Sequence, residues 1–293
     1  MADCRRPMSA LRQLGLVVHP TRNIEGVVQA ILDWASAHGV AVGQVPIIGQ
    51  ARAMVDAVDA ADCDFLLAVG GDGTALHALH AGADASRPVL AVACGSIGML
   101  TSVQAGAVVD ALDQVEAGRF TAQPVPGLEV IANDRPVGVA VNDVAVVRAG
   151  PGQILVAISV DDDLYARVAG DGAVVATSLG SSAYSMAAGG PILAPGAHGM
   201  VVTPLESHGG CTPPLLAGND SVLRLDVGLS FGGMRCEIDG RPADMAGHTL
   251  TIGHRDAYAT LIELADQESR LEGLRRRRII LDAPRTAIHD QED

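Results

Sequence analysis

The sequence predicts an α/β domain with a doubly wound parallel sheet, followed by a β-rich domain. Short apolar runs alternate with helix-like segments over residues 1–124. After Pro124 and Pro126 the pattern changes to strand-like runs joined by turn dipeptides. With 293 residues, 48% of them hydrophobic, the chain can bury the cores of two domains. We therefore expect an α/β domain over 1–124 and a β-rich domain over 125–265.

In the α/β domain, strands and helices are expected to alternate. Apolar runs predict strands at 14–18, 65–69 and 88–93, helical spacing predicts a helix at 24–38, and the Ala-rich stretch 51–60 is the second helix-like segment. A parallel strand needs a crossover connection, usually a helix, to reach its neighbour. The alternation therefore indicates parallel pairing and a doubly wound sheet.

The second region carries β-strand signals. Five strands are expected, at 127–131, 137–147, 153–160, 221–227 and 249–252. Asn-Asp, Asp-Asp and Asp-Gly dipeptides supply the turns between them. In 221–227 the alternation is clear, with Leu223 on one face and Arg224 on the other. From Asp266 the pattern becomes helical and ends in four arginines at 275–278, which we interpret as a solvated helix end favoured by the helix dipole.

Charge and composition limit the partners that the chain can have. The formal charge of −14 argues against a general nucleic-acid binder, because a broad phosphate footprint needs a basic face. All 20 positions counted as Lys or Arg are Arg, so phosphate binding must use Arg, backbone N–H groups or a metal ion. The five cysteines are scattered, which fits reduced thiols, and no apolar run approaches the length of a membrane span. We expect a cytoplasmic protein with no nucleic-acid or membrane partner.

A glycine-rich loop, Gly70-Gly71-Asp72-Gly73-Thr74, follows the predicted strand at 65–69. We expect Thr74 to cap the next helix, which places the loop at the carboxyl edge of the sheet, where open α/β folds bind ligands. The glycines let phosphate groups approach the backbone, and the helix N-terminus offers N–H donors to an anion. The loop is neither the dinucleotide fingerprint G-x-G-x-x-G nor a Walker loop.

The carboxylate of Asp72 needs an explanation, because it would be repelled by a phosphate group bound beside it. Accepting the proton of an attacking hydroxyl group would explain it, and so would holding Mg²⁺. The structural alternative is an Asp that only fixes a tight glycine turn, which is a common role for this residue. The residue types alone leave these alternatives open.

Several segments resemble the NAD kinase family, of which the chain looks like a divergent member. The GGDGT loop resembles a signature that NAD kinases share in variants with diacylglycerol kinases, sphingosine kinases and phosphofructokinases. Residues 95–101 (GSIGMLT), the pair Asn142-Asp143, the Gly-rich stretch 170–191 and the turn Asp239-Gly240 resemble later elements of the NAD kinases in the same order, and the start 16–20 (LVVHP) resembles their beginning. The resemblance covers nearly the whole chain.

The resemblance implies a fold and a reaction. The fold is an N-terminal α/β domain and a β-sandwich domain, with the C-terminal tail 266–293 returning to the first domain. The reaction transfers the γ-phosphoryl group of ATP, or of polyphosphate, to the 2′-hydroxyl of the adenosine ribose of NAD. The nucleotides NAD and ATP are then the substrates, Mg²⁺ accompanies ATP without a dedicated set of protein ligands, and the protein is a homodimer or homotetramer.

The resemblance also implies residue roles. Asp72 would orient and deprotonate the 2′-hydroxyl. The residues expected to bind nucleotide phosphates are Gly70, Gly71, Gly73, Thr74 and His77. The residues expected to bind NAD are Asn142, Asp143, Ala169, Asp171, Ser182, Ala183, Tyr184, Ala187 and Arg241.

Some of these residues also have a structural interpretation. Asn142-Asp143 could be a hairpin turn, although paired polar side chains inside an apolar β run need partners. Tyr184 could be a core residue instead of stacking on a flat ligand. His77 and His80 are one helical turn apart, but the sequence shows no third ligand for zinc.

The chain departs from the family pattern in ways that leave the phosphoryl acceptor open. His77 and Ala169 stand where relatives often carry a positive charge, and Arg241 stands where they often carry Gln. These changes leave Asp72 and its glycines untouched. Three functions therefore remain: an NAD kinase, a divergent kinase for another hydroxyl compound such as a nucleoside or polyol, and a non-catalytic sensor of NAD(H) or NADP.

Overall fold

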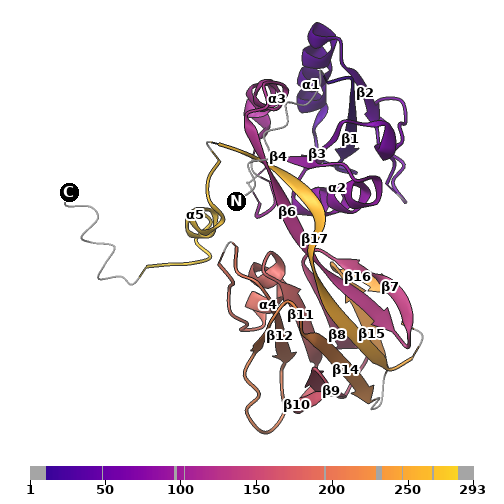
Figure 1. Ribbon diagram of the computed structural model, residues 1–293, viewed down its shortest axis with the longest axis vertical. Helices are drawn as coiled ribbons and strands as arrows, with labels where there is room; N and C mark the ends of the chain where they lie inside the picture. Colours follow the sequence, from indigo (N-terminus) through magenta and orange to yellow (C-terminus); the bar gives the residue numbers. More distant parts are fainter. Residues whose placement is uncertain are drawn as a thin grey trace, which may run out of the picture. The chain divides into compact units, whose positions relative to one another are not determined.

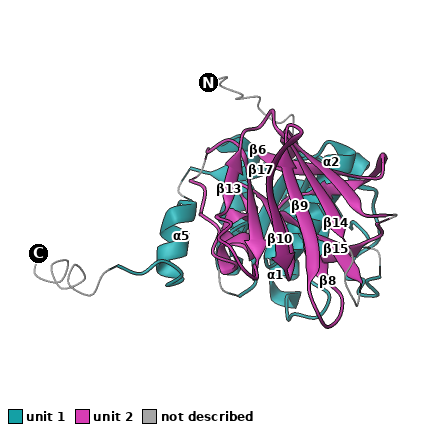
Figure 2. Ribbon diagram, turned by 90° about the horizontal axis from the view of Figure 1, so that it is seen from below, with its two compact units in different colours: residues 1–123, 260–293 teal, residues 124–259 magenta. Residues whose placement is uncertain are grey.

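The computed structural model describes residues 11–282 except 48, 96, 97, 102, 195, 229–232, 246 and 266. The chain divides into two compact units, shown in teal and magenta in Figure 2. One unit consists of Met1–Gln123 and Thr260–Asp293, and the other of Pro124–Ala259. Among the described residues, no helix has both the length and the apolar character that a membrane crossing requires.

The first unit is built on a parallel sheet (Figure 1). Its central strands run in the order β2-β1-β3-β4, all parallel to their neighbours, and β4 also pairs in parallel with β5 and with the end of β17. The strands are β1 (Gln13–Val18), β2 (Ala41–Gln44), β3 (Phe65–Gly70), β4 (Val89–Ala93), β5 (Val103–Gln104) and β17 (Thr249–Leu264). The doubly wound parallel sheet predicted from the sequence is confirmed.

Helices cover both faces of this sheet. They are α1 (Glu25–His38), α2 (Asp72–Ala85), α3 (Val108–Glu116) and the short 3-10 helices at Ala60–Asp62 and Ala105–Ala107. Side chains of α1 and α3 share one core with alternate residues of the strands, such as Phe65, Leu67 and Val69 of β3. Because successive side chains of a strand point to opposite faces, α2, which packs on β3 and β4, covers the other face.

The last described helix of this unit, α5 (Arg270–Arg276), begins with a capping box between Ser269 and Glu272. Its exposed arginines pair with carboxylates, Arg275 with Asp282 at 2.6 Å and Arg276 with Glu268 at 2.9 Å. These contacts fit the interpretation of the arginine run as a solvated helix end.

The second unit is a β-sandwich of two antiparallel sheets. One sheet has the order β13-β12-β11-β8-β15-β16, and the other includes β10-β9-β14-β17, with β6 pairing to β17 and β7. The remaining elements are β6 (Phe120–Ala132), β7 (Arg135–Ala140), β8 (Asp143–Arg148), β9 (Ile154–Val160), β10 (Asp163–Gly170), β11 (Gly172–Thr177), the 3-10 helix Gly180–Ser182, α4 (Tyr184–Ala187), β12 (Met200–Leu205), β13 (Leu215–Ala217), β14 (Val222–Gly228), β15 (Met234–Ile238) and β16 (Arg241–Ala243). Both sheets contribute to one buried core, with Val144 from β8 and Leu223 from β14.

Two sequence-based predictions of local structure were wrong. The Ala-rich stretch 51–60 contains no α-helix, because the side chain of Gln44 bonds the carbonyl of Arg52 and the N–H of Met54 and holds an irregular connection. The single strand expected at 137–147 is two strands, β7 and β8, which belong to different sheets. Strand β2 and helix α3 were not predicted.

Candidate active site

A cavity of about 420 Å³ opens at the carboxyl edge of the parallel sheet in the first unit. The loops after β1, β2 and β3 line it. Strand β1 lies between β2 and β3. The chain therefore continues from β1 to β2 in one direction across the sheet and from β3 to β4 in the opposite direction. Open α/β sheets bind ligands at such a topological switch point, outside the carboxyl ends of the strands.

The GGDGT loop forms one wall of this cavity. Gly70 ends β3, Gly71 is the extended N-cap residue, and Asp72 is the first residue of α2. Thr74 is therefore not the cap that the sequence predicted. It lies in the first helical turn, nearly buried, and its N–H bonds the carbonyl of Gly71 at 2.9 Å. The first amides of a helix lack carbonyl partners within the helix, so this wall offers N–H donors to an anion.

The carboxylate of Asp72 is held by the loop that follows β4. Its Oδ2 accepts the N–H of Met99 at 2.8 Å, and its Oδ1 accepts the N–H of Leu100 at 3.0 Å. A Cβ atom at Gly98 would overlap this carboxylate, so only glycine allows the approach. These bonds reach another loop, which argues against an Asp that only fixes its own glycine turn.

The sequence did not indicate that residues 98–100 orient Asp72. The element at 95–101 was noted only as a resemblance, and Ser96 and Ile97 of this element lie outside the described residues. The hydroxyl of Thr101 accepts the N–H of Gly98 at 2.7 Å and thereby stabilises the turn. The available signal was a second glycine-containing loop after the next predicted strand, because adjacent parallel strands place such loops at one edge of the sheet.

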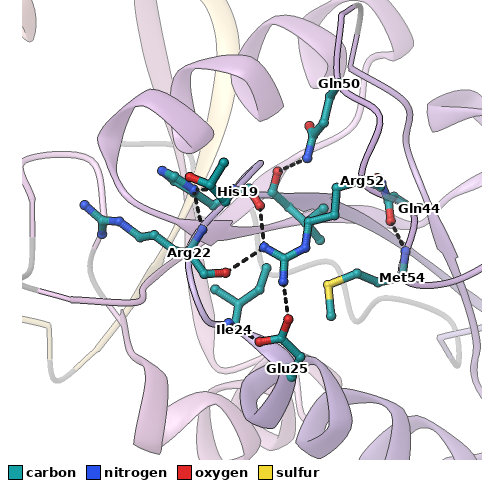
Figure 3. Close-up of polar contacts among 10 residues, drawn as sticks. His19, Arg22, Ile24, Glu25, Gln44, Gln50, Arg52 and Met54 are labelled. Atoms are coloured by element: carbon teal, nitrogen blue, oxygen red, sulfur yellow. Dashed lines mark hydrogen bonds and ion pairs between the residues drawn. The ribbon is translucent and has the colours of Figure 1, made fainter.

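The loop after β1 also lines the cavity, and Figure 3 shows its polar contacts. The Nδ1 atom of His19 accepts the N–H groups of Thr21 and Arg22 at 3.2 and 3.1 Å. Burial, and then the nearby charges of Arg22 and Arg52, lower the pKa of His19 below its usual value. The ring is therefore neutral at pH 7, with its proton on Nε2. The sequence had indicated His19 only as part of the start 16–20 (LVVHP), one of the segments that carry the family resemblance, and had indicated neither Arg22 nor Arg52.

In the second unit, the predicted pair Asn142-Asp143 lies where the chain passes from β7 to β8, hence from one sheet to the other. It is not a hairpin turn. The carboxylate of Asp239 accepts the backbone N–H groups of Val141 at 2.9 Å, Asn142 at 2.6 Å and Asp143 at 3.2 Å. The sequence indicated Asp239 only as part of a turn. In the structure, its side chain holds the segment that passes from one sheet to the other.

The carboxyl group of Asp143 is buried, and its surroundings raise its pKa to about 7. Burial is the main cause, and the negative charges of Asp239 and Glu237 add to it. A bond from the backbone N–H of Tyr184 acts in the opposite direction. Asp143 is therefore partly protonated at neutral pH and can then donate a hydrogen bond.

We expect this shift to make folding stability depend on pH. A carboxyl group with a raised pKa in the folded state contributes stability below its unfolded pKa of about 4, and this contribution is lost as the pH rises through about 7. Thermal melts of the wild type and Asp143→Asn should therefore show the wild type losing Tm relative to the variant between pH 5 and pH 8. The exposed Asp163→Asn is the control and should follow the wild type. A wild-type curve parallel to that of Asp143→Asn would show that the carboxyl titrates normally.

The turn after β11 packs directly on Asn142. The N–H of Thr177 bonds the carbonyl of Asn142 at 2.9 Å, and a Cβ atom at Gly180 would overlap that carbonyl. This contact positions the 3-10 helix and α4, which carry the predicted residues Ser182, Ala183, Tyr184 and Ala187. The side chain of Tyr184 is 40% exposed and is therefore not a core residue.

Asp171 and Tyr184 share a second cavity, of about 310 Å³, in this unit. Arg148 and Arg235 also line it, and the sequence had singled out neither of them. The Nε atom of Arg148 lies 2.6 Å from Oδ1 of Asp171. The lining does not include Ala169, on β10, or the exposed Arg241, on β16. The positive charge beside Asp171 and Tyr184 thus comes from β8 and β15.

The described residues contain one group of three side chains able to hold a metal ion, formed by His38, Asp113 and Glu116. All three are exposed, and none lines either cavity. His77 and His80 belong to no such group in the described part of the chain. The Nδ1–H of His77 donates instead to the carbonyl of Gly73 at 2.7 Å.

Two family models match this chain, one mainly in each unit. Residues 17–120 match the family model of the ATP-NAD kinase N-terminal domain, and residues 141–254 match that of the ATP-NAD kinase C-terminal domain. A relative named NAD kinase, from Heliobacterium modesticaldum, is 31% identical over 211 residues, which cover 70% of this chain and 75% of the relative.

Two solved structures share the fold. The yeast NADH kinase complexed with NADH has a TM-score of 0.79 at 21% identity and covers 94% of this chain and 89% of its own. An NAD kinase from Archaeoglobus fulgidus in complex with ATP has a TM-score of 0.73 at 22% identity and covers 92% of this chain and 100% of its own. The α/β domain followed by a β-sandwich is the architecture expected from the sequence.

Proposed function

The chain belongs to the ATP-NAD kinase family, and on this premise we propose that it transfers the γ-phosphoryl group of ATP, or of polyphosphate, to the 2′-hydroxyl of the adenosine ribose of NAD. It is thus a phosphotransferase with an alcohol group as acceptor, and its product is NADP. The curated relatives favour neither a kinase for nucleosides or polyols nor a non-catalytic sensor.

The placement of Asp72 is the observation that carries this proposal. An ionised carboxylate has about four acceptor sites, and the amides of Met99 and Leu100 occupy one on each oxygen of Asp72. The remaining sites can accept the proton of the 2′-hydroxyl. The ribose oxygen then attacks the γ-phosphorus, the bond from that phosphorus to the bridging oxygen breaks, and ADP leaves.

The donor phosphates would be held by the backbone of the GGDGT loop. Gly71 and Gly73 line the cavity and leave the backbone accessible, and the first amides of α2 point a partial positive charge at an anion. Gly70, which is buried at the end of β3, stays a prediction. Thr74 lies in the first turn of α2, and both Thr74 and His77 line the same cavity. We assign these roles from the residue types and from the positions of the residues around the cavity.

Mg²⁺ is compatible with this site, because it prefers oxygen ligands and usually binds through one or two carboxylates together with substrate phosphates. Phosphate oxygens of ATP and water would supply its ligands without a dedicated set of protein ligands, and Asp72 would keep its carboxylate for the 2′-hydroxyl. When bound, the ion neutralises charge that develops on the phosphates.

In the second unit, we assign NAD binding to the residues around the sheet crossing. Asn142 and Asp143 would hydrogen-bond the nucleotide, and Tyr184 would stack on a flat ring. Asp171 would hold a ribose hydroxyl, and Ser182, Ala183 and Ala187 would line the surrounding wall. Ala169 and Arg241 stay predictions from the family pattern. We further infer that the protein works in the cytoplasm as a homodimer or homotetramer.

The experiment that tests the function is a kinase assay of purified protein with ATP and Mg²⁺. We expect NADP to form from NAD. The acceptor panel also contains NADH, nucleosides and polyols, and a parallel series replaces ATP with polyphosphate. Efficient phosphorylation of a nucleoside or polyol without NADP formation would contradict the proposal, as would NAD binding without any transfer.

The side chain of Asn142 gives a direct test of NAD binding. We expect Asn142→Ala to weaken NAD binding by about 1–3 kcal/mol, because a buried polar group of the ligand loses its partner. The Tm should stay close to the wild type, since the hydrogen bonds of residue 142 to Asp239 and Thr177 use its backbone. Calorimetric titration and thermal melts measure both quantities. An unchanged affinity together with a lowered Tm would assign Asn142 a structural role.

A further inference from the structure

Among the described residues that line the cavity at the switch point, Arg22 alone carries a guanidinium group. Asp72 contributes a negative charge to the same cavity. A donor phosphate chain bound there adds further negative charge, and the protein has no Lys to balance it. Arginine binds phosphate through several N–H groups in a fixed planar arrangement, which makes it suited to this task.

The guanidinium of Arg22 is held beside the GGDGT loop. Its Nη1 atom donates to the carbonyl of Cys94 at 3.0 Å. A Cβ atom would lie 2.9 Å from Nη1 at Gly95 and 3.5 Å from Nη1 at Gly71, so two glycines leave room for the group. Gly71 is the N-cap of α2. The Arg22 side chain thus lies next to the first amides of that helix, where an anion would meet both kinds of donor.

A second donor comes from the same loop. Because Nδ1 of His19 accepts two backbone N–H groups, the proton of the neutral ring is on Nε2. His19 lines the cavity together with Arg22. The loop therefore presents an imidazole N–H in addition to the guanidinium.

Arg52 holds this loop in place, as the dashed lines of Figure 3 show. Its Nη1 donates to the carbonyls of His19 at 3.0 Å and Arg22 at 2.6 Å, and its Nη2 pairs with Glu25 at 2.6 Å. The side chain of Arg52 is 16% exposed, whereas that of its partner Glu25 is 65% exposed. Arg52 does not line the cavity itself.

We propose that Arg22 is a ligand of the phosphate chain of the donor, assisted by His19, and that Arg52 is a positioning residue that acts through the Arg22 loop. The inference rests on the proposed function, since it assigns the donor phosphates to this cavity. It extends the phosphate site beyond the GGDGT loop to the segment after β1, from His19 to Arg22.

Steady-state kinetics test the ligand role. Arg22→Ala should raise KM for ATP by about 10- to 100-fold, the range expected for lost hydrogen bonds to charged groups, while KM for NAD changes less than about twofold. The KM of Arg22→Lys for ATP should lie between those of the wild type and Arg22→Ala. An ammonium group keeps the charge but loses the planar arrangement of donors. Arg119→Ala, which removes an exposed arginine outside the cavity, is the matched control and should behave as the wild type.

A double variant tests the positioning role. Arg52→Ala should also raise KM for ATP and leave KM for NAD unchanged. If Arg52 acts only through Arg22, the double variant Arg22→Ala, Arg52→Ala should show the same KM for ATP as Arg22→Ala alone. Additive increases would overturn the positioning role, and so would Arg52→Ala with a lowered Tm and an unchanged KM for ATP.

Calorimetric titration with inorganic tripolyphosphate separates this inference from the proposed function. Wild-type protein should bind tripolyphosphate, and Arg22→Ala should weaken that binding by about the same factor as the KM for ATP. Equal binding by both proteins, with equal KM for ATP, would overturn the inference while leaving the kinase function intact. A wild type that forms no NADP would overturn the function, and the titration would still decide whether Arg22 binds the phosphate chain.

Discussion

Asp72→Asn should lower kcat for NADP formation by about 10²- to 10⁴-fold, the usual contribution of a general base. The neutral amide of Asn is not basic and cannot take up the proton of the 2′-hydroxyl. NAD affinity should change little, because in the proposed mechanism Asp72 contacts NAD at a single hydroxyl group and the other residues assigned to NAD binding are unchanged. Single-turnover kinetics with saturating ATP and NAD measure the chemical step, and calorimetric titration measures NAD affinity.

The substitution also has a local structural effect that needs a control. The Asn amide would turn its NH₂ group towards the N–H of Met99 or Leu100, where the wild-type carboxylate accepts both. Thermal melts report any loosening of that loop. Asp84→Asn changes an exposed carboxylate of the same helix and should keep wild-type kcat. If Asp72→Asn also keeps wild-type kcat, Asp72 is structural and the mechanism is wrong.

Gly98→Ala should reduce kcat by about 10²-fold or more, although the substituted residue touches no substrate in the proposed mechanism. The new Cβ atom would overlap the Asp72 carboxylate, which must then leave the amides of Met99 and Leu100 or push their loop away. Misplacing a catalytic group by about 1 Å can cost about 10²-fold in rate.

A glycine elsewhere in the same unit provides the comparison for Gly98→Ala. A Cβ atom at Gly106 would meet no other atom within 4 Å, so Gly106→Ala should keep wild-type kcat and Tm. The kinetics of both variants are measured with saturating NAD and ATP. Full activity of Gly98→Ala would show that the Asp72 carboxylate does not depend on this approach.

The parts of the fold that the sequence predicted are those with a local signal. The apolar run 65–69 is completely buried in β3, and the glycines after it mark the end of that strand. The conformation of 51–60 could not be predicted from its alanines, because the side chain of Gln44, from β2, sets it. Composition indicates what a segment can form, and a distant polar partner can override it.

The same distinction applies to the sites. Asp72 stands out because a carboxylate among glycines is unusual at the end of an apolar run. Its orientation by Met99 and Leu100 joins residues 27 and 28 positions apart, and Asp239 reaches Asn142 across 97 positions. Arg22 and Arg52 are single arginines in irregular segments. Contacts of this kind depend on which loops the folded sheet brings together, so no local sequence pattern predicts them.

The first compact unit is discontinuous in sequence, which sets an order for its assembly during synthesis. Leu261 pairs with Val89 of β4, and Ile262 is fully buried in the core of that unit. A nascent chain supplies neither residue until Pro124–Ala259 has been translated. The sandwich, being continuous, is therefore the unit that can finish folding first. The α/β unit remains without its last core strand until the ribosome has passed residue 264. The Val89 end of β4, which β5 does not cover, is a place where a chaperone or a second nascent chain could bind.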